Sequence, residues 1–306
     1  MINYSIIIPH KNIPYLLQRC IDSIPYRDDV QIIVIDDNSD PTIVDFSNFP
    51  GCNRPQVEIY FTKDGRGAGY ARNVGLQHVK GKWVLFADAD DLFTDDLGNI
   101  LDKYLESDYE IIYFKIISID SETGIPSSRG DVVNNVIQKA IVTGNLDILR
   151  YQRLEPWAKI MSYKLIKNNE IIFDETIAAN DLMFSIKSAS VAKNIFIDEA
   201  PLYCLTSRYG SLAHTISLKV CDAKYSVILN VNDYLYKIKK YHYRINIFYY
   251  IWYFRYFGIY LTVKKIIYAF KRMPFLYALY DMNYFFLYLL KHAFEKKNNT
   301  LIKIEK

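Results

Sequence analysis

The sequence predicts an α/β protein built on an open, mostly parallel sheet. Unbroken apolar runs at 4–8, 31–35 and 82–87 are typical of strands that are buried on both faces. Segments with apolar residues at helical spacing alternate with these runs, as in chains that fold into β–α–β units. Polar residues follow the three runs directly. Since the carboxyl ends of parallel strands meet at one edge of a sheet, where ligands bind, we expect a ligand site there.

The predicted elements follow one another without an internal repeat. The first strand is expected to stop at Pro9, and apolar residues between Ile13 and Ile24 then predict an amphipathic helix. The further elements expected in this half are strands at 31–35, 57–61, 82–87 and 110–117, helices at 70–79 and 97–105, and a flexible loop at 65–69.

The second half of the chain changes character twice. Residues 120–150 are punctuated by Ser, Gly, Asn and Asp, and they predict an insertion or a segment that carries a lid. Residues 154–215 return to compact α/β character, and the pattern then becomes helical, aromatic and basic. We therefore expect one α/β domain over 1–218 and a helical region over 219–306.

Composition narrows the class of protein. Of the 306 residues 51% are hydrophobic, which supports a sizeable core and excludes a disordered protein. The four cysteines are scattered without a CxxC pair, which argues against a zinc site or a disulfide framework and indicates a reducing compartment. The first residues enter a strand pattern at once and show no signal peptide, so we expect a cytoplasmic protein.

Charge and aromatic residues are concentrated in the last part of the chain. Residues 234–306 contain 14 Lys and Arg against three acids, a balance of +11 in a chain of net charge +3. The aromatic runs at 248–257 and 284–290 are too interrupted for clean membrane spans. Together these features favour a helix at an anionic membrane surface. The alternatives are a helical subdomain packed on the first domain or on a second copy of the chain, and no nucleic-acid module is visible.

Three carboxylates crowd the end of the strand at 82–87, in the run Asp88-Ala89-Asp90-Asp91. Like charges at this spacing repel one another unless a cation or strong donors lie among them. A divalent cation with oxygen ligands is one explanation. The alternative is that the acids cap the following helix, a role in which we place Asp91.

Four motifs in register resemble a family 2 glycosyltransferase with the GT-A fold. They lie at residues 5–12, 34–39, 71–75 and 81–91. The resemblance assigns 1–118 to the half that binds a nucleotide-sugar donor and 119–218 to the half that binds the acceptor. It implies an inverting enzyme that moves a sugar from a nucleotide-diphosphate donor, with UDP as the expected nucleotide, to a carbohydrate or lipid-linked acceptor in bacterial surface polysaccharide synthesis.

The resemblance also implies roles for the acids of the donor half. Asp90 reaches a Mn²⁺ or Mg²⁺ ion with Asp88 nearer the ribose, and the metal neutralises the leaving diphosphate. Asp36 or Asp37 accepts hydrogen bonds from uracil and ribose, and an Asx turn is the alternative for this pair. Ala89 is the middle residue of the metal motif.

Further residues of the donor half lie where the family contacts the nucleotide. They include Pro9, His10 and Asn12. His10 either stacks on the base or is a plain surface residue. Arg72 pairs either with a phosphate or with the acidic cluster.

Asp181 is the catalytic candidate. In the family the motif is usually Glu-Asp, and its Asp is the general base that takes the proton of the acceptor hydroxyl. Here Asn180 replaces the Glu, which leaves the orienting neighbour open. The alternative is that Asp181 caps the helix at 182–190, whose N-terminus would favour the ionised carboxylate.

Other residues of the acceptor half carry weaker expectations. Trp157 and Lys159 contact a sugar or simply pack. Arg208 and His214 close over the diphosphate or lie in a connecting loop.

Two rival functions stay open. A sugar nucleotidyltransferase should carry a Gly-rich loop with Arg directly after the first strand, where this chain has Pro9-His10-Lys11-Asn12. A catalytically inactive scaffold that binds sugar or membrane is kept open by Asn180. The favoured reading is an active transferase, peripheral at the inner face of the cell membrane.

Overall fold

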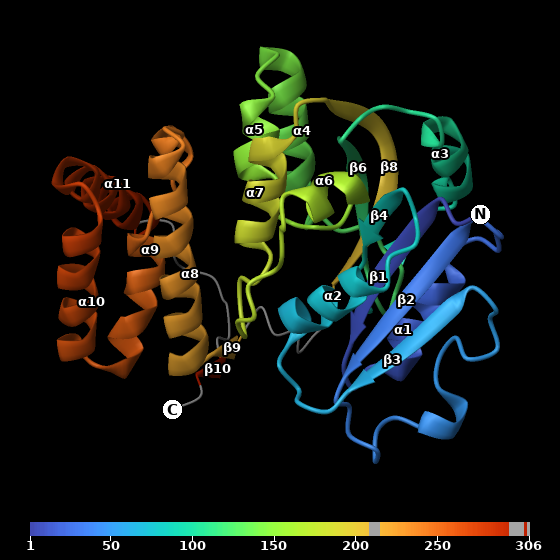
Figure 1. Ribbon diagram of the computed structural model, residues 1–306. Coiled ribbons are helices and arrows are strands. Elements are labelled where there is room, and N and C mark those ends of the chain that lie inside the picture. Colours follow the sequence, from blue (N-terminus) through green and yellow to red (C-terminus); the bar gives the residue numbers. More distant parts are fainter. Residues whose placement is uncertain (208–214, 294–302, 305–306) are drawn as a thin grey trace. The chain divides into compact units, whose positions relative to one another are not determined.

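The computed structural model describes residues 1–207, 215–293 and 303–304, which fall in two compact units. The units are Met1–Tyr209 and Gly210–Lys306 (Figure 1). Composition placed the boundary at 218, and the predicted division of the first unit into donor and acceptor halves stays a prediction.

The first unit is built on a mixed sheet with the strand order β3-β2-β1-β4-β7-β6-β8-β5. The strands are β1 (Tyr4–His10), β2 (Val30–Asp37), β3 (Val57–Thr62), β4 (Trp83–Phe86), β5 (Leu92–Phe93), β6 (Ile111–Asp120), β7 (Lys159–Ser162) and β8 (Ile195–Ser207). Strands β3, β2, β1 and β4 are parallel, whereas β7 lies antiparallel between β4 and β6, and β5 is antiparallel to β8. The predicted α/β class is confirmed.

Helices cover both faces of this sheet. They are α1 (Pro14–Asp22), α2 (Ala68–Gln77), α3 (Leu97–Tyr104), α4 (Asp131–Thr143), α5 (Asp147–Gln152), α6 (Tyr163–Asn168) and α7 (Leu182–Val191), with a short 3₁₀ helix at Phe46–Asn48. Successive side chains of a strand point to opposite faces. Ile6 and Ile8 therefore pack in the core with α1 and α3, while Ile7 faces Gly75 of α2 on the other side.

The predicted end of the first strand at Pro9 is wrong, because β1 continues through Pro9 to His10. Strand β4 pairs only with Tyr4–Ile7, so beyond Ile7 only β2 lies beside β1. The missing N–H of Pro9 thus leaves no sheet hydrogen bond unmade on the β4 side. The strand thereby carries the ring of His10 into the carboxyl edge of the sheet.

The segment at 120–150, expected as an insertion or a segment that carries a lid, is largely helical, and that expectation stays a prediction. Residues Asp131–Thr143 form α4, and the side-chain amide of Asn134 bonds the backbone of Ile116 in β6 at 3.0 and 2.8 Å. Helix α4 also buries Val133, Ile137 and Ala140. The polar residues that suggested an insertion belong to its solvent face and to the turns around it.

The second unit is helical, as the pattern predicted. Its elements are β9 (Thr215–Ile216), α8 (Leu218–Lys237), a 3₁₀ turn at Tyr241–Tyr243, α9 (Phe248–Ile251), a 3₁₀ helix at Trp252–Phe257, α10 (Ile259–Arg272), α11 (Phe275–Ala293) and β10 (Lys303–Ile304). Among the helices that the structure describes, none is long and apolar enough to cross a membrane.

Candidate active site

The polar clusters that follow the three predicted strands lie at one edge of the sheet, as expected. Strands β2, β1 and β4 lie side by side (Figure 1). His10 at the end of β1 is opposite Asp36 of β2, and β4 ends at Phe86, two residues before Asp88. The start of α2 reaches the same edge, because the backbone N–H of Gly67 donates to Asp37 at 2.8 Å. The site is therefore assembled from strand ends and one helix N-terminus.

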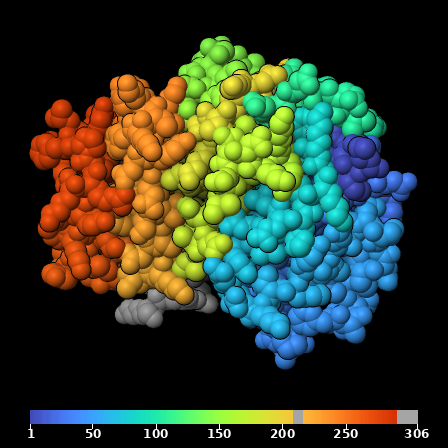
Figure 2. Space-filling model, in the orientation of Figure 1, coloured from blue at the N-terminus to red at the C-terminus, as the bar shows by residue number. Residues whose placement is uncertain are grey.

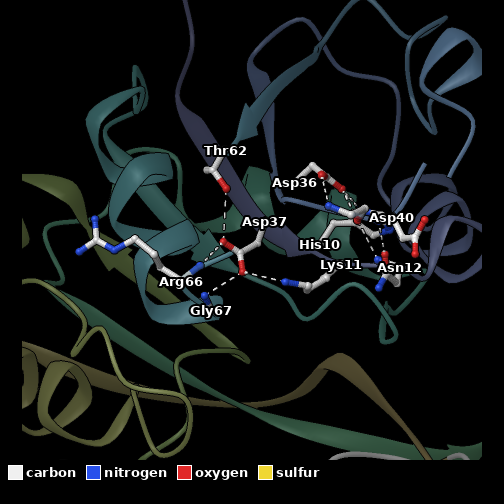
Figure 3. A network of polar contacts seen from close by, with 10 residues as sticks. His10, Lys11, Asn12, Asp36, Asp37, Asp40, Thr62, Arg66 and Gly67 are labelled. Carbon is white, nitrogen blue, oxygen red and sulfur yellow. Dashed lines mark hydrogen bonds and ion pairs between the residues drawn. The ribbon is translucent and has the colours of Figure 1, made fainter. Parts of the chain in front are cut away.

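His10 is only 2% exposed and is fixed by two hydrogen bonds. The backbone N–H of Ile13 donates to Nε2 at 3.1 Å, and Nδ1 lies 2.7 Å from a carboxylate oxygen of Asp36 (Figure 3). Because Nε2 accepts, the proton of a neutral ring is on Nδ1 and is donated to Asp36. Both expectations for His10, a base-stacking ring and a surface residue, are corrected: the ring is buried and holds Asp36.

Asp36 is a buried acceptor inside the turn that follows β2. Besides His10 it accepts from the backbone N–H of Ser39 at 2.9 Å and from its hydroxyl at 2.6 Å. Burial opposes ionisation of Asp36, but the hydrogen bonds from His10 and Ser39 outweigh it and hold the pKa below its usual value. The local side-chain to backbone bond expected as an alternative for this pair is present at Asp36, although it reaches the N–H of Ser39, three residues on, rather than two as in an Asx turn.

Asp37 faces the other way and holds the glycine-rich loop (Figure 3). Its carboxylate accepts from the backbone N–H groups of Arg66 and Gly67 at 3.0 and 2.8 Å, and from the Thr62 hydroxyl at 3.3 Å. The ammonium of Lys11 lies 3.8 Å away. The loop expected to be simply flexible is thus tied to the end of β2 in this structure.

Asn12 ties the loop after β1 to the loop after β2. It adopts a left-handed conformation with φ of 58°, its N–H donates to the Ser39 hydroxyl at 2.8 Å, and its side-chain oxygen accepts from the Asp40 N–H at 2.7 Å. Asn is among the few residues that adopt this conformation readily. Asn12 therefore shapes the rim of the site together with Pro9, which lies within β1.

Arg72 is buried and joins the two sides of the site. One guanidinium nitrogen donates to Asp88 at 2.6 Å and another to the side-chain oxygen of Asn180 at 2.9 Å. Of its two expected partners, a phosphate and the acidic cluster, the structure shows the cluster. Arg72 thereby fixes the residue beside Asp181 relative to the metal motif, although the two are far apart in sequence.

Asn73, the next residue of α2, also binds the loop that contains Asn180 and Asp181. Its amide donates to the carbonyl oxygen of Phe173 at 3.0 Å and accepts from the Phe173 N–H at 2.8 Å. Arg66 pairs with Glu175 nearby. The first turns of α2 therefore hold the 173–181 loop by side-chain and backbone contacts together.

Gly69 is the position where α2 and the 173–181 loop approach each other most closely, and substituting it should destabilise the protein. A Cβ there would lie 2.1 Å from the carbonyl oxygen of Asp174 and 2.9 Å from Cβ of Asn180. We expect Gly69→Ala to lower the free energy of unfolding by about 3 kcal/mol, since backbone must move to make room. Urea denaturation measures this.

The matched control for that substitution is Gly98→Ala in α3. A Cβ at Gly98 meets nothing within 4 Å. Since Ala favours helix over Gly, this variant should be unchanged or more stable by about 0.5–1 kcal/mol. Equal stability of the two variants would contradict the tight contact at Gly69.

The acidic cluster after β4 divides into two kinds of carboxylate. Asp88 and Asp90 are half-buried, whereas Asp91 is buried and accepts from the Thr206 N–H at 2.7 Å and the Tyr203 hydroxyl at 2.9 Å. Burial, followed by the charges of Asp88 and Asp90, raises the pKa of Asp91 well above its usual value. The expectation that Asp91 caps a helix is wrong: it holds β8, and Ala89 is buried between the two half-buried acids.

Asp181 precedes α7 but does not cap it with its side chain. The cap alternative is thereby excluded. Burial raises the pKa of Asp181 above its usual value, and the positive charge of Arg72 offsets this only in part. The helix N-terminus was expected to favour the ionised carboxylate, but desolvation is the larger effect on this pKa.

Tyr203 is a site residue that the sequence reasoning missed. Its hydroxyl accepts from the backbone N–H of Asp88 at 2.9 Å and bonds Asp91, so it fixes the metal motif from β8. Trp157 stacks on Tyr203 with ring centroids 5.2 Å apart. One tyrosine among 27 carries no sequence signal for this role. Trp157 therefore packs, which was one of its two expected roles.

Lys159 at the start of β7 is also buried, so it packs. Its ammonium donates to the carbonyl oxygen of Arg153 at 2.6 Å, and burial lowers the pKa of Lys159 to about 7. Arg208 and His214, together with the 208–212 segment, lie outside the described residues.

Comparison with known proteins gives one family. The sequence model described as "Glycosyl transferase family 2" matches residues 5–159. Among curated proteins, the chain is 29% identical over 217 residues to the poly(ribitol-phosphate) beta-glucosyltransferase of Bacillus spizizenii, covering 67% of this chain and 32% of that protein. It is 25% identical over 222 residues to the poly(ribitol-phosphate) beta-N-acetylglucosaminyltransferase TarS of Staphylococcus aureus, covering 69% and 36%. The match thus spans about a third of the length of these relatives.

A solved structure has the same fold. The crystal structure of S. aureus TarS 1–349 in complex with UDP-GlcNAc aligns with a TM-score of 0.58 at 22% identity, covering 75% of this chain and 65% of that one. The predicted GT-A type of α/β fold is therefore confirmed.

Proposed function

The chain belongs to glycosyl transferase family 2, and we propose that it transfers a sugar from a nucleotide diphosphate donor to an acceptor hydroxyl with inversion at the anomeric carbon. The observation that carries the proposal is the bridge made by Arg72. It bonds both Asp88, in the metal motif, and Asn180, beside Asp181. A donor diphosphate and an attacking hydroxyl must lie close together for transfer. The bridge holds Asp88, which is proposed to serve the diphosphate, near the residue that precedes Asp181, which is proposed to serve the hydroxyl.

A divalent cation is part of the proposal, and the residues fit one. Among the described residues no three His, Cys, Asp or Glu side chains are placed to hold a metal ion by themselves. Two carboxylates at a strand end nevertheless suit Mg²⁺ or Mn²⁺, which complete their coordination with substrate phosphates and water. Asp90 and Asp88 would hold the ion. It would supply charge neutralisation at the leaving diphosphate.

For the nucleotide we assign Asp37 rather than Asp36. Asp36 is enclosed by His10 and Ser39, which are buried with it. Asp37 is also buried, but the ammonium of Lys11 that lies 3.8 Å from its carboxylate belongs to an exposed side chain, and its other partners include two backbone N–H groups of the glycine-rich loop. Uracil N3–H and ribose hydroxyls are donors that a carboxylate accepts. TarS, which shares the fold, has been crystallised with UDP and with UDP-GlcNAc, and this supports a UDP-linked donor.

Asp181 is proposed as the general base. It would accept the proton of the acceptor hydroxyl as that oxygen bonds the anomeric carbon and the bond to the diphosphate breaks. Burial raises the pKa of Asp181 and makes its carboxylate a stronger base than a solvated one, while the charge of Arg72 offsets part of this rise. Relatives act on poly(ribitol-phosphate), so a carbohydrate or lipid-linked acceptor of a surface polymer is the proposed class.

The test of this function is release of UDP from UDP-sugars by the purified chain with Mn²⁺, with and without candidate acceptors. Turnover of any nucleotide-sugar supports the transferase. Its absence across UDP-, GDP- and TDP-sugars, with the donor still bound, would favour the catalytically inactive scaffold instead. Formation of a nucleotide-sugar from a sugar phosphate and UTP would favour the nucleotidyltransferase.

The pH dependence of turnover should reveal the raised pKa of Asp181. A base works in its ionised form, so kcat/KM falls as pH is lowered through its pKa. Since that pKa lies above the ordinary value of Asp, about 3.9, the acidic limb should begin at a higher pH than for a solvated carboxylate. UDP binding measured over the same range separates this limb from protonation of the donor site. A limb at or below the ordinary value would exclude Asp181 as the base.

A further inference from the structure

The second unit exposes a broad apolar face along α11. Over residues 275–289, for which the structure describes burial, the fully buried side chains of this helix form a narrow stripe at Ala278, Asp281 and Phe285. Leu276 is 77% exposed and Leu287 is 59% exposed. The other large side chains exposed along α11 are Phe275, Leu279, Tyr280, Tyr284, Phe286 and Tyr288. A solvent-exposed apolar face of this extent marks an interaction site.

Helix α10 adds a second exposed face in which lysines alternate with apolar residues. Tyr260 is 81% exposed, and Lys264, Ile267 and Lys271 follow it at spacings of four, three and four residues, which places them on one side of the helix. The two helices are in contact and follow one another across Met273–Pro274. In the space-filling view the orange-red and red side chains of this segment lie open to solvent on the face shown (Figure 2).

The exposed charges of α10 and α11 that lie outside ion pairs with α8 are positive: Lys265 and Arg272 of α10 pair with Asp222 and Asp233 of α8. Between residues 234 and 293 the sequence contains a single acid, Asp281. That acid is buried, and its two oxygens accept from the guanidinium of Arg244 at 2.5 and 3.1 Å. Its charge is therefore neutralised inside the unit, while Lys237, Lys239, Lys264 and Lys271 remain exposed. What α10 and α11 present to solvent is apolar, aromatic and cationic.

We propose that the exposed faces of α10 and α11 dock on an anionic lipid surface. Aromatic rings and long aliphatic side chains enter the boundary between headgroups and acyl chains, and lysines among them bind anionic headgroups. A second copy of the chain fits less well, because its identical face carries the same positive charge. No described helix can cross a membrane, so the attachment is to one surface. The proposal concerns the second unit and does not depend on the transferase activity.

Flotation of the full chain with vesicles tests the proposal. We expect the protein to float with vesicles of phosphatidylcholine and phosphatidylglycerol at low salt, to float less at high salt, and to stay in the bottom fraction with pure phosphatidylcholine. The double variant Leu276→Ser with Leu287→Ser should lose most of the floating fraction. Its matched control is Val132→Ser with Val142→Ser, which changes exposed valines of α4 in the first unit.

The contribution of the lysines is tested by a double variant and a matched control. Lys264→Glu with Lys271→Glu should abolish binding to anionic vesicles, whereas Lys139→Glu with Lys164→Glu makes the same charge change on exposed residues of α4 and α6 and should leave flotation intact. Circular dichroism and the unfolding midpoint confirm that each variant is folded. Three results would each overturn the proposal. The wild-type protein could fail to float, or the variants could float like wild type. Light scattering could also show that the wild type is a dimer and the leucine double variant a monomer.

Discussion

Asp181→Asn is expected to abolish sugar transfer while leaving UDP binding unchanged. The amide has nearly the shape of the carboxylate but cannot accept the proton of the acceptor hydroxyl. General-base catalysis contributes typically 10²–10⁴-fold, so we expect kcat to fall by about that factor. Asp181 makes no side-chain cap to α7, so the substitution removes no helix cap. Turnover of a UDP-sugar and calorimetric binding of UDP measure the two effects.

The matched control for this variant is Asp174→Asn. Asp174 lies on the same loop, is half-buried, and burial raises its pKa as it does for Asp181. A general loss of a buried charge from the loop would therefore affect both variants alike. We expect Asp174→Asn to retain transfer. Transfer retained in Asp181→Asn would remove this residue from its proposed role.

Asp90→Ala is expected to abolish the part of UDP binding that depends on Mn²⁺. If Asp90 and Asp88 hold the cation, losing one of two protein carboxylates should weaken UDP binding on the order of 100-fold, which corresponds to about 2.7 kcal/mol. Binding without added metal should change far less. Titration calorimetry with and without Mn²⁺ distinguishes the two contributions.

Asp95→Ala provides the control, because Asp95 is an exposed carboxylate five residues further along the chain. It should bind UDP and Mn²⁺ as the wild type does. Asp91 is unsuitable as a control, since it is buried and holds Tyr203 and Thr206 of β8. Metal-dependent binding that is equal in Asp90→Ala and wild type would falsify the metal assignment.

The fold class was predictable because its signals are local. The apolar runs of β1, β2 and β4 are long enough to identify buried strands, and parallel pairing alone then brings His10, Asp36 and Asp88 to one edge. The errors were local as well. Pro9 was expected to end the first strand, yet β1 continues to His10. At Pro9 strand β4 has already ended, so no hydrogen bond to β4 is lost through the missing N–H.

The roles of single residues were harder to predict because they depend on side-chain direction. His10 and Asp37 are near neighbours of Asp36 in space, but His10 turns inward to bond Asp36 while Asp37 turns to the glycine-rich loop. Neighbouring residues of a strand point to opposite faces, so a one-residue difference decides which partners each of these two buried carboxylates contacts. Two adjacent aspartates in a sequence do not show which partners each will contact, so the sequence left the choice between Asp36 and Asp37 open.

The α/β class, the family resemblance and the acids that follow the strands were predictable, since each depends on residues that are adjacent along the chain. Which of those residues contact one another depends on the packing of the elements. Arg72 bonds Asn180 from 108 residues away, and Tyr203 bonds Asp91 from 112 residues away. The sequence also contains Asp281, the single acid between residues 234 and 293, but only the tertiary contacts show that this acid is buried against Arg244. Such contacts follow from the packing of whole elements, and no local pattern encodes them.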